Sequence, residues 1–135
     1  MLWKDGQRDA SQMVVLSVLA DGPSYGYLIT KTVAARSDGK VRLTPGVLYP
    51  LLKGLENEGL VTTHWEEVKS DRAEPGEDGR KRKWYSLSAK GRQRLEQHIS
   101  AHRSYLEIME SFIGRLGGRL GRPGDGTGGE SEASA

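Results

Sequence analysis

The sequence predicts a mainly α-helical protein with a small β-hairpin and a long C-terminal helix. Apolar residues recur at helical spacing in three short segments between residues 11 and 58. Two segments rich in β-branched and aromatic residues, 60–66 and 82–87, flank a polar loop at 67–81. A last segment, 89–116, repeats apolar residues with a helical period and contains no proline.

The first predicted helix covers residues 11–20, which are apolar at helical spacing. Asp9 or Ser11 supplies the capping oxygen at its start. The helix ends at Asp21-Gly22-Pro23, because neither glycine nor proline continues a helix well. Residues 1–8 are therefore expected to be an N-terminal extension that precedes the domain.

The second predicted helix begins after a cap at Ser24 and runs from Tyr25 to about Ala35. A Ser-Asp-Gly turn at 37–39 follows it. Spacings of three and four residues give this helix one apolar side, which we expect to face the core. That side consists of Leu28, Ile29, Thr32 and Val33.

The third predicted helix opens with Thr44 as its cap and Pro45 at its first position, where proline is well tolerated. Gly59 ends it, and Leu60 supplies the apolar contact that commonly follows such an end. Pro50 removes one backbone hydrogen bond, so we expect an irregular first turn. The buried side consists of Val47, Leu48, Leu51, Leu52 and Leu55.

The hairpin that follows carries four adjacent cations, Arg80-Lys81-Arg82-Lys83, which alone are typical of a solvated loop. Three short helices and then a hairpin with a basic tip is the element order of a winged helix-turn-helix. In that fold the third helix enters the major groove and the wing contacts the DNA backbone. We therefore predict a winged-helix domain over residues 9–87, with phosphate contacts from the basic cluster. Trp84 and Tyr85 are expected to pack rather than to stack on bases.

The long helix, capped by Ser88 and running from Ala89 to about Leu116, carries a heptad pattern. Its length of about 42 Å exceeds the body of so small a domain, so we expect residues 88–116 to dimerise with a second copy. The alternative is packing within one chain. The heptad row consists of Leu95, Ile99, His102, Leu106, Met109, Ile113 and Leu116, with His98, Tyr105 and Phe112 beside it.

The composition excludes several classes of protein. The 135 residues include no cysteine, which excludes a disulfide scaffold and a cysteine zinc site. The sequence has neither an apolar run long enough for a membrane span nor a signal-peptide order at its start, so we expect a cytoplasmic protein with no membrane partner. Glycine dominates residues 117–135, which we predict to be a disordered tail.

The exposed side of the third helix supplies candidate DNA-binding residues. Lys53 suits a phosphate or a guanine edge, and Tyr49 suits a phosphate unless it packs at the helix surface. Gly46 permits close approach of the backbone. Tyr25 opens the second helix, where a phosphate is favoured unless the ring packs in the core. The full set is Tyr25, Thr44, Gly46, Tyr49, Lys53, Arg80, Lys81, Arg82 and Lys83, and alternation along the strand leaves about two of the wing cations for DNA.

No constellation in the sequence indicates an enzyme, a metal site or a cofactor. His98 and His102 are four residues apart on one helix, but no acidic residue has helical spacing to both, so we predict no metal. Glycines 117, 118 and 121 follow a helix, whereas a nucleotide-binding fingerprint follows a strand. The alternative to DNA binding is a winged-helix module that binds another protein, and the basic wing argues against it.

Three motifs resemble the PadR-type transcriptional regulators. The first is Leu-x-x-Gly-Pro-x-Tyr-Gly-Tyr at 19–27. The second is Gly-Val-Leu-Tyr-Pro-Leu-Leu-Lys-x-Leu-Glu-x-x-Gly-Leu-Val at 46–61, and the third is Gly-Arg-Lys-Arg-Lys-Trp-Tyr-x-Leu-Ser-x-x-Gly at 79–91. The resemblance covers about residues 10–115, and the single C-terminal helix resembles the short subgroup of the family. The Gly-rich tail and the acidic stretch 74–78 fall outside the common pattern.

This resemblance implies a dimeric repressor that binds an inverted repeat at a promoter, often its own. It also implies release from DNA when a small, often aromatic, effector binds. An effector pocket would form where the long helices meet the N-terminal helix, and the alternative for its side chains is the ordinary core of a dimer. The candidate pocket residues are Trp3, Met13, Tyr105, Met109 and Phe112.

Overall fold

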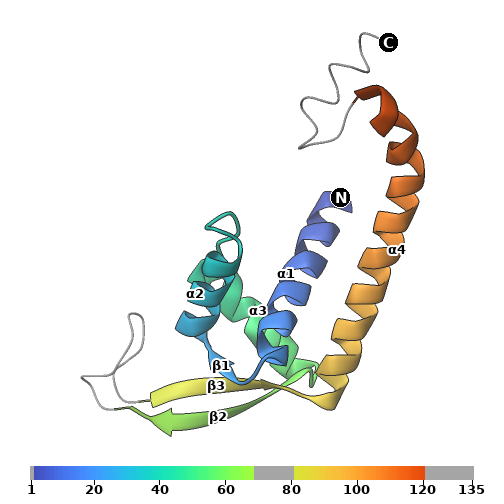
Figure 1. Cartoon of the computed structure of the whole chain (residues 1–135). Helices are drawn as coiled ribbons and strands as arrows, with labels where there is room; N and C mark the ends of the chain where they lie inside the picture. Colours follow the sequence, from blue (N-terminus) through green and yellow to red (C-terminus); the bar gives the residue numbers. More distant parts are fainter. Residues whose placement is uncertain (1, 69–80, 121–135) are drawn as a thin grey trace. The chain divides into compact units, whose positions relative to one another are not determined.

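The protein is described by a computed structural model that covers residues 2–68 and 81–120, with side chains for 8–68 and 81–116. The chain forms two compact units, one up to His98 and one from Ile99 onward. Along the described chain the elements are α1 (Leu2–Ala20), β1 (Ser24–Tyr25), α2 (Gly26–Arg36), α3 (Pro45–Asn57), β2 (Val61–Glu67), β3 (Lys81–Leu87) and α4 (Ala89–Leu120), labelled in Figure 1.

The strands form one antiparallel sheet in the order β1-β3-β2. β2 and β3 are the predicted hairpin, with Val61 opposite Leu87 at one end and Glu67 opposite Lys81 at the other. Helices α1, α2 and α3 lie on one face of this sheet (Figure 1). Helices packed on a small antiparallel sheet confirm the predicted mainly α fold class.

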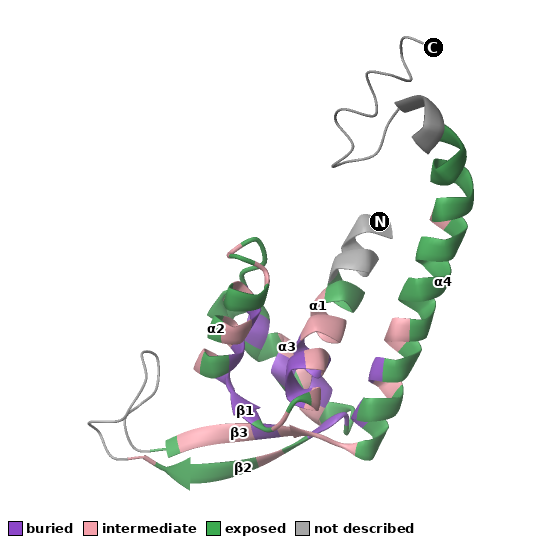
Figure 2. Cartoon of the chain, viewed as in Figure 1, coloured by how far each residue is buried: buried purple, intermediate pink, exposed green. Residues whose placement is uncertain are grey.

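The hydrophobic core of the first unit lies where the three helices meet each other and the sheet (Figure 2). Each fully buried leucine or valine contributes roughly 1.5–3 kcal/mol relative to its exposed state, so this core accounts for most of the stabilisation. Its members come from every helix of this unit and from the sheet. The residues are Val15, Leu16, Val18, Leu19, Tyr25, Ile29, Val33, Leu43, Leu48, Leu52, Leu55, Leu60, Val61, Tyr85 and Leu95.

The first helix begins earlier than predicted. Because α1 starts at Leu2, neither Asp9 nor Ser11 caps it, and residues 2–8 continue the helix instead of forming an extension. Each residue added to an existing helix gains a backbone hydrogen bond without a second nucleation cost. No proline interrupts residues 2–8, and Gly6 alone costs about 1 kcal/mol relative to alanine.

The predicted cap at Ser24 is wrong. Ser24 and Tyr25 form β1, where they pair with Tyr85 and Trp84 of β3 and extend the predicted hairpin to three strands. The Ser24 hydroxyl is buried and has no hydrogen-bond partner among the described residues. The N-cap position belongs to Tyr25, whose backbone is extended and whose side chain makes no capping hydrogen bond, so α2 begins at Gly26.

Two predicted core residues are exposed instead. Leu28 of α2 is 37% exposed and Val47 of α3 is 51% exposed, while Thr32 and Leu51 are half-buried. Each helix contacts the core along a narrower stripe than a four- or five-residue set requires, because successive residues turn by about 100°. The buried stripes are Gly26, Ile29 and Val33 on α2 and Leu48, Leu52 and Leu55 on α3.

The ends of α3 agree with the sequence prediction. Thr44 occupies the N-cap position, although its side chain makes no capping hydrogen bond. Gly59 has a φ of +76°, and the Leu60 amide donates to the Leu55 carbonyl at 2.9 Å, which is the pattern of a Schellman end. Pro50 lies inside the unbroken helix, and the expected irregular first turn is not found. One lost bond this close to the helix start is tolerated.

Ser88 caps α4, as predicted. Its hydroxyl accepts a hydrogen bond from the Gly91 amide at 2.9 Å and donates one to the Gly59 carbonyl at 2.7 Å. Gly91 lies so close to Leu60, directly before β2, that an added Cβ would overlap the Leu60 carbonyl oxygen. The helix reaches Leu120, beyond the predicted end at Leu116, so residues 117–120 belong to α4 and not to a tail. The other residues predicted as a disordered tail, 121–135, lie outside the described residues.

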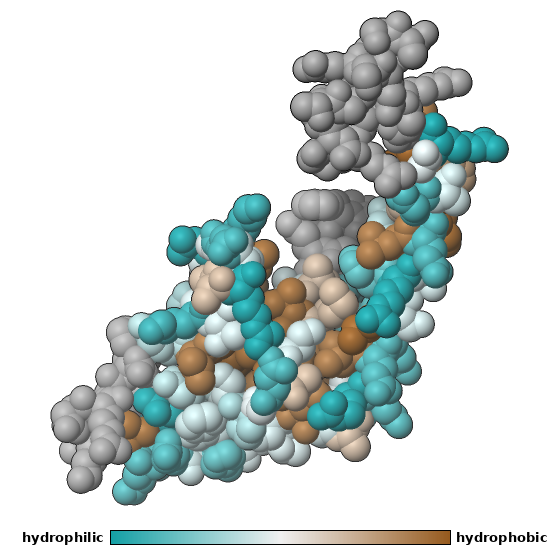
Figure 3. Space-filling view, viewed as in Figure 1, coloured by the Kyte–Doolittle hydropathy of each residue, from teal (hydrophilic) through white to brown (hydrophobic). Residues whose placement is uncertain are grey.

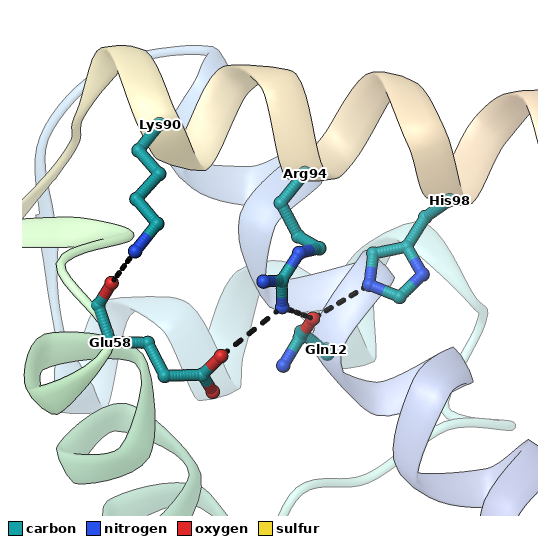
Figure 4. A network of polar contacts seen from close by, with 5 residues as sticks. All are labelled: Gln12, Glu58, Lys90, Arg94 and His98. Atoms are coloured by element: carbon teal, nitrogen blue, oxygen red, sulfur yellow. Dashed lines mark hydrogen bonds and ion pairs between the residues drawn. The ribbon is translucent and has the colours of Figure 1, made fainter.

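A polar network joins the first turns of α4 to α1 and to the end of α3 (Figure 4). Lys90 Nζ donates to the Glu58 carbonyl at 2.8 Å, and Arg94 Nη1 lies 3.3 Å from the Glu58 carboxylate. Arg94 also reaches Gln12 Oε1 at 3.5 Å, and His98 Nε2 lies 2.6 Å from the same oxygen. Leu95, between Arg94 and His98 on α4, is buried in the core of the first unit.

The rest of α4, from Ile99 onward, has a different surface. We call residues 99–120 the distal half of α4. Between Ile99 and Leu116 no side chain is buried, and most large apolar ones are exposed (Figures 2 and 3). Within the described ranges, no helix combines the length and apolar composition that a membrane span requires.

Candidate nucleic-acid interface

The candidate interface starts with α3, which buries one side and exposes the opposite one. The exposed side carries Gly46, Lys53 and Asn57, and Thr44 is exposed just before the helix. A Cβ added at Gly46 would meet no atom within 4 Å, so the backbone is open there. Three of the predicted contact residues, Thr44, Gly46 and Lys53, are therefore exposed to solvent, and Gly46 and Lys53, seven residues apart, share one side of α3.

Tyr49 lies between packing and exposure. Its ring is 48% exposed, and its hydroxyl lies directly against Gly26. An added Cβ at Gly26 would approach the Tyr49 Cζ atom to 2.8 Å, so only glycine leaves room for the tyrosine at the start of α2. Tyr49 thus joins α3 to α2, and a contact from its exposed edge to DNA stays a prediction.

Tyr25 is a packing residue in this structure. Its ring is 9% exposed and meets the Trp84 ring edge-on at 5.0 Å between centroids. The Arg82 guanidinium lies 4.0 Å from the centre of the same ring, within range of a cation–π interaction. These contacts match the packing alternative that the sequence left open, and a phosphate contact by Tyr25 stays a prediction.

The wing is the hairpin of β2 and β3, and alternation sorts its cations between two faces. Arg82 and Trp84 share one face of β3, whereas Lys81, Lys83 and Tyr85 share the other. Lys81 is exposed at the end of the strand, while Arg82 and Lys83 are half-buried. Arg80 lies outside the described residues, as does the acidic stretch 74–78.

Lys83 is held by α3. Its Nζ lies 3.0 Å from Glu56 Oε1 of α3, and the other carboxylate oxygen of Glu56 accepts a hydrogen bond from Thr63 Oγ1 of β2 at 3.2 Å. The same ammonium lies 5.7 Å from the centre of the Trp65 ring and 5.5 Å from that of Tyr85. One carboxylate of α3 therefore binds both strands of the wing.

The electrostatics of this cluster follow from the contacts. The hydrogen bond from Lys83 lowers the pKa of Glu56 below its usual value of 4.5. Burial raises the pKa of the Tyr85 hydroxyl above its usual 10.0, and the Glu56 carboxylate adds to that rise. At neutral pH the cluster thus contains a carboxylate, an ammonium and a neutral phenol.

Trp84 belongs to the opposite face of the sheet and packs, as the sequence predicted. Its indole Nε1 donates to the Glu66 carboxylate at 2.9 Å, and the His64 ring stacks on it with 6.2 Å between centroids. The indole is half-buried between these neighbours and Tyr25. These contacts hold the indole within the sheet, which disfavours stacking on a base.

A groove of about 820 Å³ lies between α1, the segment before α3 and α3 itself. Val41, Val47 and Leu51 contribute apolar surface, and Arg8, Lys40 and Arg42 contribute positive charge. None of the predicted effector-pocket residues lines it. Met13 lies in the first unit, Tyr105, Met109 and Phe112 lie in the second, and the Trp3 side chain lies outside the described residues, so that pocket stays a prediction.

Two further features bear on the predicted sites. In residues 8–68 and 81–116, no group of three or more histidine, aspartate or glutamate side chains could hold a metal ion.

The contacts of Glu56 could not be predicted from the sequence, where this residue is only one position of a motif. Its partners Lys83 and Thr63 are 27 and 7 residues away, a proximity that needs the packing of α3 on the sheet.

Comparison with known proteins supports a regulator. The chain matches the transcriptional regulator PadR-like family over residues 15–97. It is 30% identical over 124 residues to the transcriptional regulator Rv3488 of Mycobacterium tuberculosis, covering 92% of this chain and 99% of that protein. The match to the transcriptional regulator YqjI of Escherichia coli is 29% identical and covers 76% of this chain but only 42% of that protein.

Solved structures share the fold. A transcriptional regulator from Clostridium thermocellum superposes with a TM-score of 0.66 at 24% identity, covering 81% of this chain and 95% of that one. A PadR family transcription regulator from Clostridium difficile gives a TM-score of 0.58 at 25% identity, covering 76% and 96% of the two chains.

A winged-helix unit with an exposed third helix and a basic hairpin defines the class of DNA-binding transcriptional regulators. Within that class, this chain belongs to the PadR-like family. The resemblance found in the sequence motifs is thereby confirmed.

Proposed function

We propose that the protein is a dimeric repressor that binds an inverted-repeat operator in double-stranded DNA. The observation that carries this proposal is the exposed side of α3 in a PadR-family regulator, where Gly46 and Lys53 share one helix side beside a basic wing and Thr44 is exposed at the N-cap. A helix with one open, cation-bearing side fits the major groove, and wing cations fit the adjacent phosphates.

The distal half of α4 supports the dimer. Leu106 is 50%, Ile113 52% and Leu116 47% exposed, although all three belong to the predicted heptad row. Tyr105, Ile108 and Phe112 add further exposed apolar surface next to that row. A contiguous apolar stripe of this kind usually marks an association site. Two copies joined by a two-fold axis would present two α3 helices to two half-sites.

The groove beside α3 is the proposed effector site. Its lining combines apolar residues with three cations and one carboxylate, Glu58, and this net positive charge supports a small aromatic anion as the chemical class of ligand. A ligand there would contact Val47 and Leu51 of α3 directly and could change how that helix meets DNA. The proposal includes the cytoplasmic location expected from the sequence, because the proposed partner of the protein is DNA.

The test is a selection of duplexes from a random pool by the purified full-length chain, followed by fluorescence anisotropy. The proposal predicts enrichment of an inverted repeat with half-sites about 10 base pairs apart. It also predicts at least about 10³-fold preference over random duplex and an affinity that falls steeply with salt. Equal, weak binding to both duplexes would favour the alternative, a winged-helix module that binds another protein.

A further inference from the structure

Glu56 connects the two parts of the candidate DNA surface, α3 and the wing, through polar contacts that we call the Glu56 bridge. Glu56 lies on α3, and its two carboxylate oxygens take one hydrogen bond from each strand of the wing, from Lys83 on β3 and from Thr63 on β2. The strand register places Thr63 opposite Tyr85 and Trp65 opposite Lys83. These four side chains therefore share the face of the sheet that meets α3.

The bridge has more contacts than an isolated ion pair. The side chains of Lys83 and Glu56 are 30% and 37% exposed, so water screens them less than a free pair. The aromatic rings of Trp65 and Tyr85 also lie beside the ammonium. Lys83 is thus held in place by a carboxylate and two rings, and its charge is already compensated within the protein.

We infer that Glu56 is a positioning residue that fixes the wing relative to α3, and that Lys83 pairs with Glu56 in this bridge instead of with a DNA phosphate. The inference rests on the proposed DNA-binding function. Base contacts come from α3 and phosphate contacts from the wing, so specific binding needs both in one fixed relation.

The end of the same helix offers a matched control. Glu58, the C-cap residue directly after α3, also forms an ion pair, with Arg94 at 3.3 Å and side chains 49% and 32% exposed. That pair joins the end of α3 to α4, whereas the Glu56 pair joins α3 to the wing. Removal of the Glu58 carboxylate should therefore cost similar stability and leave the position of the wing unchanged.

The experiment uses the full chain and a duplex selected by the wild type from a random pool. Glu56→Gln, Lys83→Gln, their double variant and Glu58→Gln are compared by anisotropy on the selected and a scrambled duplex, over a salt series. Thermal unfolding of each variant shows that it is folded. Lys53→Gln, which removes a predicted phosphate or base contact, calibrates the salt slope.

The inference predicts that Glu56→Gln and Lys83→Gln each lower the ratio of specific to scrambled affinity about tenfold. The double variant loses no more than the larger single effect, because both changes break one bridge. In Lys83→Gln the slope of log affinity against log salt stays at the wild-type value. In Lys53→Gln it flattens by about 0.9, as expected for one lost phosphate contact. Glu58→Gln keeps the wild-type ratio.

Three outcomes would overturn the inference. A slope that flattens in Lys83→Gln as it does in Lys53→Gln would show that Lys83 contacts phosphate. Additive losses in the double variant, or an equal loss of specificity in Glu58→Gln, would show that Glu56 has no particular link to the wing. A selection that enriches no duplex would instead reject the proposed function, and this role with it.

Discussion

The winged-helix unit and the distal half of α4 differ in where they place their apolar side chains. All buried large apolar residues of the described chain lie in the first unit, and Leu95 is the last of them along the sequence. From Ile99 to Leu116 the helix also carries large apolar residues at helical spacing, but it buries none of them (Figure 2). The first unit is thus stabilised by its own core, whereas the apolar residues of the second are left for the proposed dimer.

The difference shows two uses of one amphipathic pattern. A helix stripe such as that of α3 is covered within the chain and determines its fold. The distal half of α4 continues the same spacing, but no described side chain between Ile99 and Leu116 is buried, so under the proposed function the same physical force acts in association. Changes in the two regions should therefore affect two different observables, unfolding and assembly.

The largest expected effect is in the core. Leu52→Ala, at a side chain that is 0% exposed, should lower the free energy of unfolding by about 2–5 kcal/mol. Urea unfolding followed by tryptophan fluorescence measures it, because Trp65 and Trp84 lie in the winged-helix unit. The matched control is Leu106→Ala, where the side chain is 50% exposed. Equal losses at both positions would contradict the proposed difference between the regions.

A charge in the heptad row should change the assembly of the protein without changing the unfolding of the winged-helix unit. Ile113→Glu, at a 52% exposed position, should reduce the sedimenting mass from twice 14.8 kDa to 14.8 kDa, because a carboxylate cannot be buried unpaired in a dimer core. The midpoint of its fluorescence-detected unfolding should equal that of a wild-type subunit that is not assembled into a dimer. Ser104→Glu, exposed on another side of the helix, serves as the charge control. An unchanged mass for Ile113→Glu would contradict the heptad row as the interface.

The Ser88 cap should have a smaller effect, because it is one hydrogen-bonding group at the junction of the sheet and α4. Ser88→Ala leaves the Gly91 amide and the Gly59 carbonyl without their partner and should cost about 0.5–2 kcal/mol in urea unfolding. Ser100→Ala, on the exposed surface of the same helix, should cost nothing. A loss of the same size at Ser100 would show that the effect is not due to capping.

The smallest expected effect is a pH dependence of the wing bridge. The pKa of Glu56 is lowered in the folded protein, so its contribution to stability is present above 4.5 and is lost as the pH falls through the folded value. The difference in unfolding free energy between wild type and Glu56→Gln should therefore shrink on going from pH 7 to pH 3. A difference that stays constant down to pH 3 would mean that the carboxylate charge is not involved.

Much of this fold could be predicted from local sequence signals. Gly59 with Leu60 marked the end of α3, and Ser88 marked the start of α4, because caps and left-handed glycines leave a residue-specific signature. Strand β1 could not be predicted, since two residues carry no period and their pairing with β3 depends on the tertiary fold. The early start of α1 likewise had no capping residue to mark it.

The candidate interface was predictable only in part. The exposed positions of Thr44, Gly46 and Lys53 followed from the spacing of buried leucines in α3. The contact partners of the individual wing cations could not be predicted in this way. Alternation along a strand shows which residues share a face, but not which residues lie opposite that face. Lys83 meets Glu56 and Arg82 meets Tyr25 through packing between distant segments, which a linear pattern cannot encode.

The most direct test of the account is the mass of the complex between the full chain and its selected duplex, measured by analytical ultracentrifugation. We expect two chains of 14.8 kDa to bind together to each duplex. A duplex with only one half-site should bind a single chain with lower affinity. One chain per duplex, bound equally well to the half-site alone, would contradict a regulator that uses its core to fold and its distal helix to assemble.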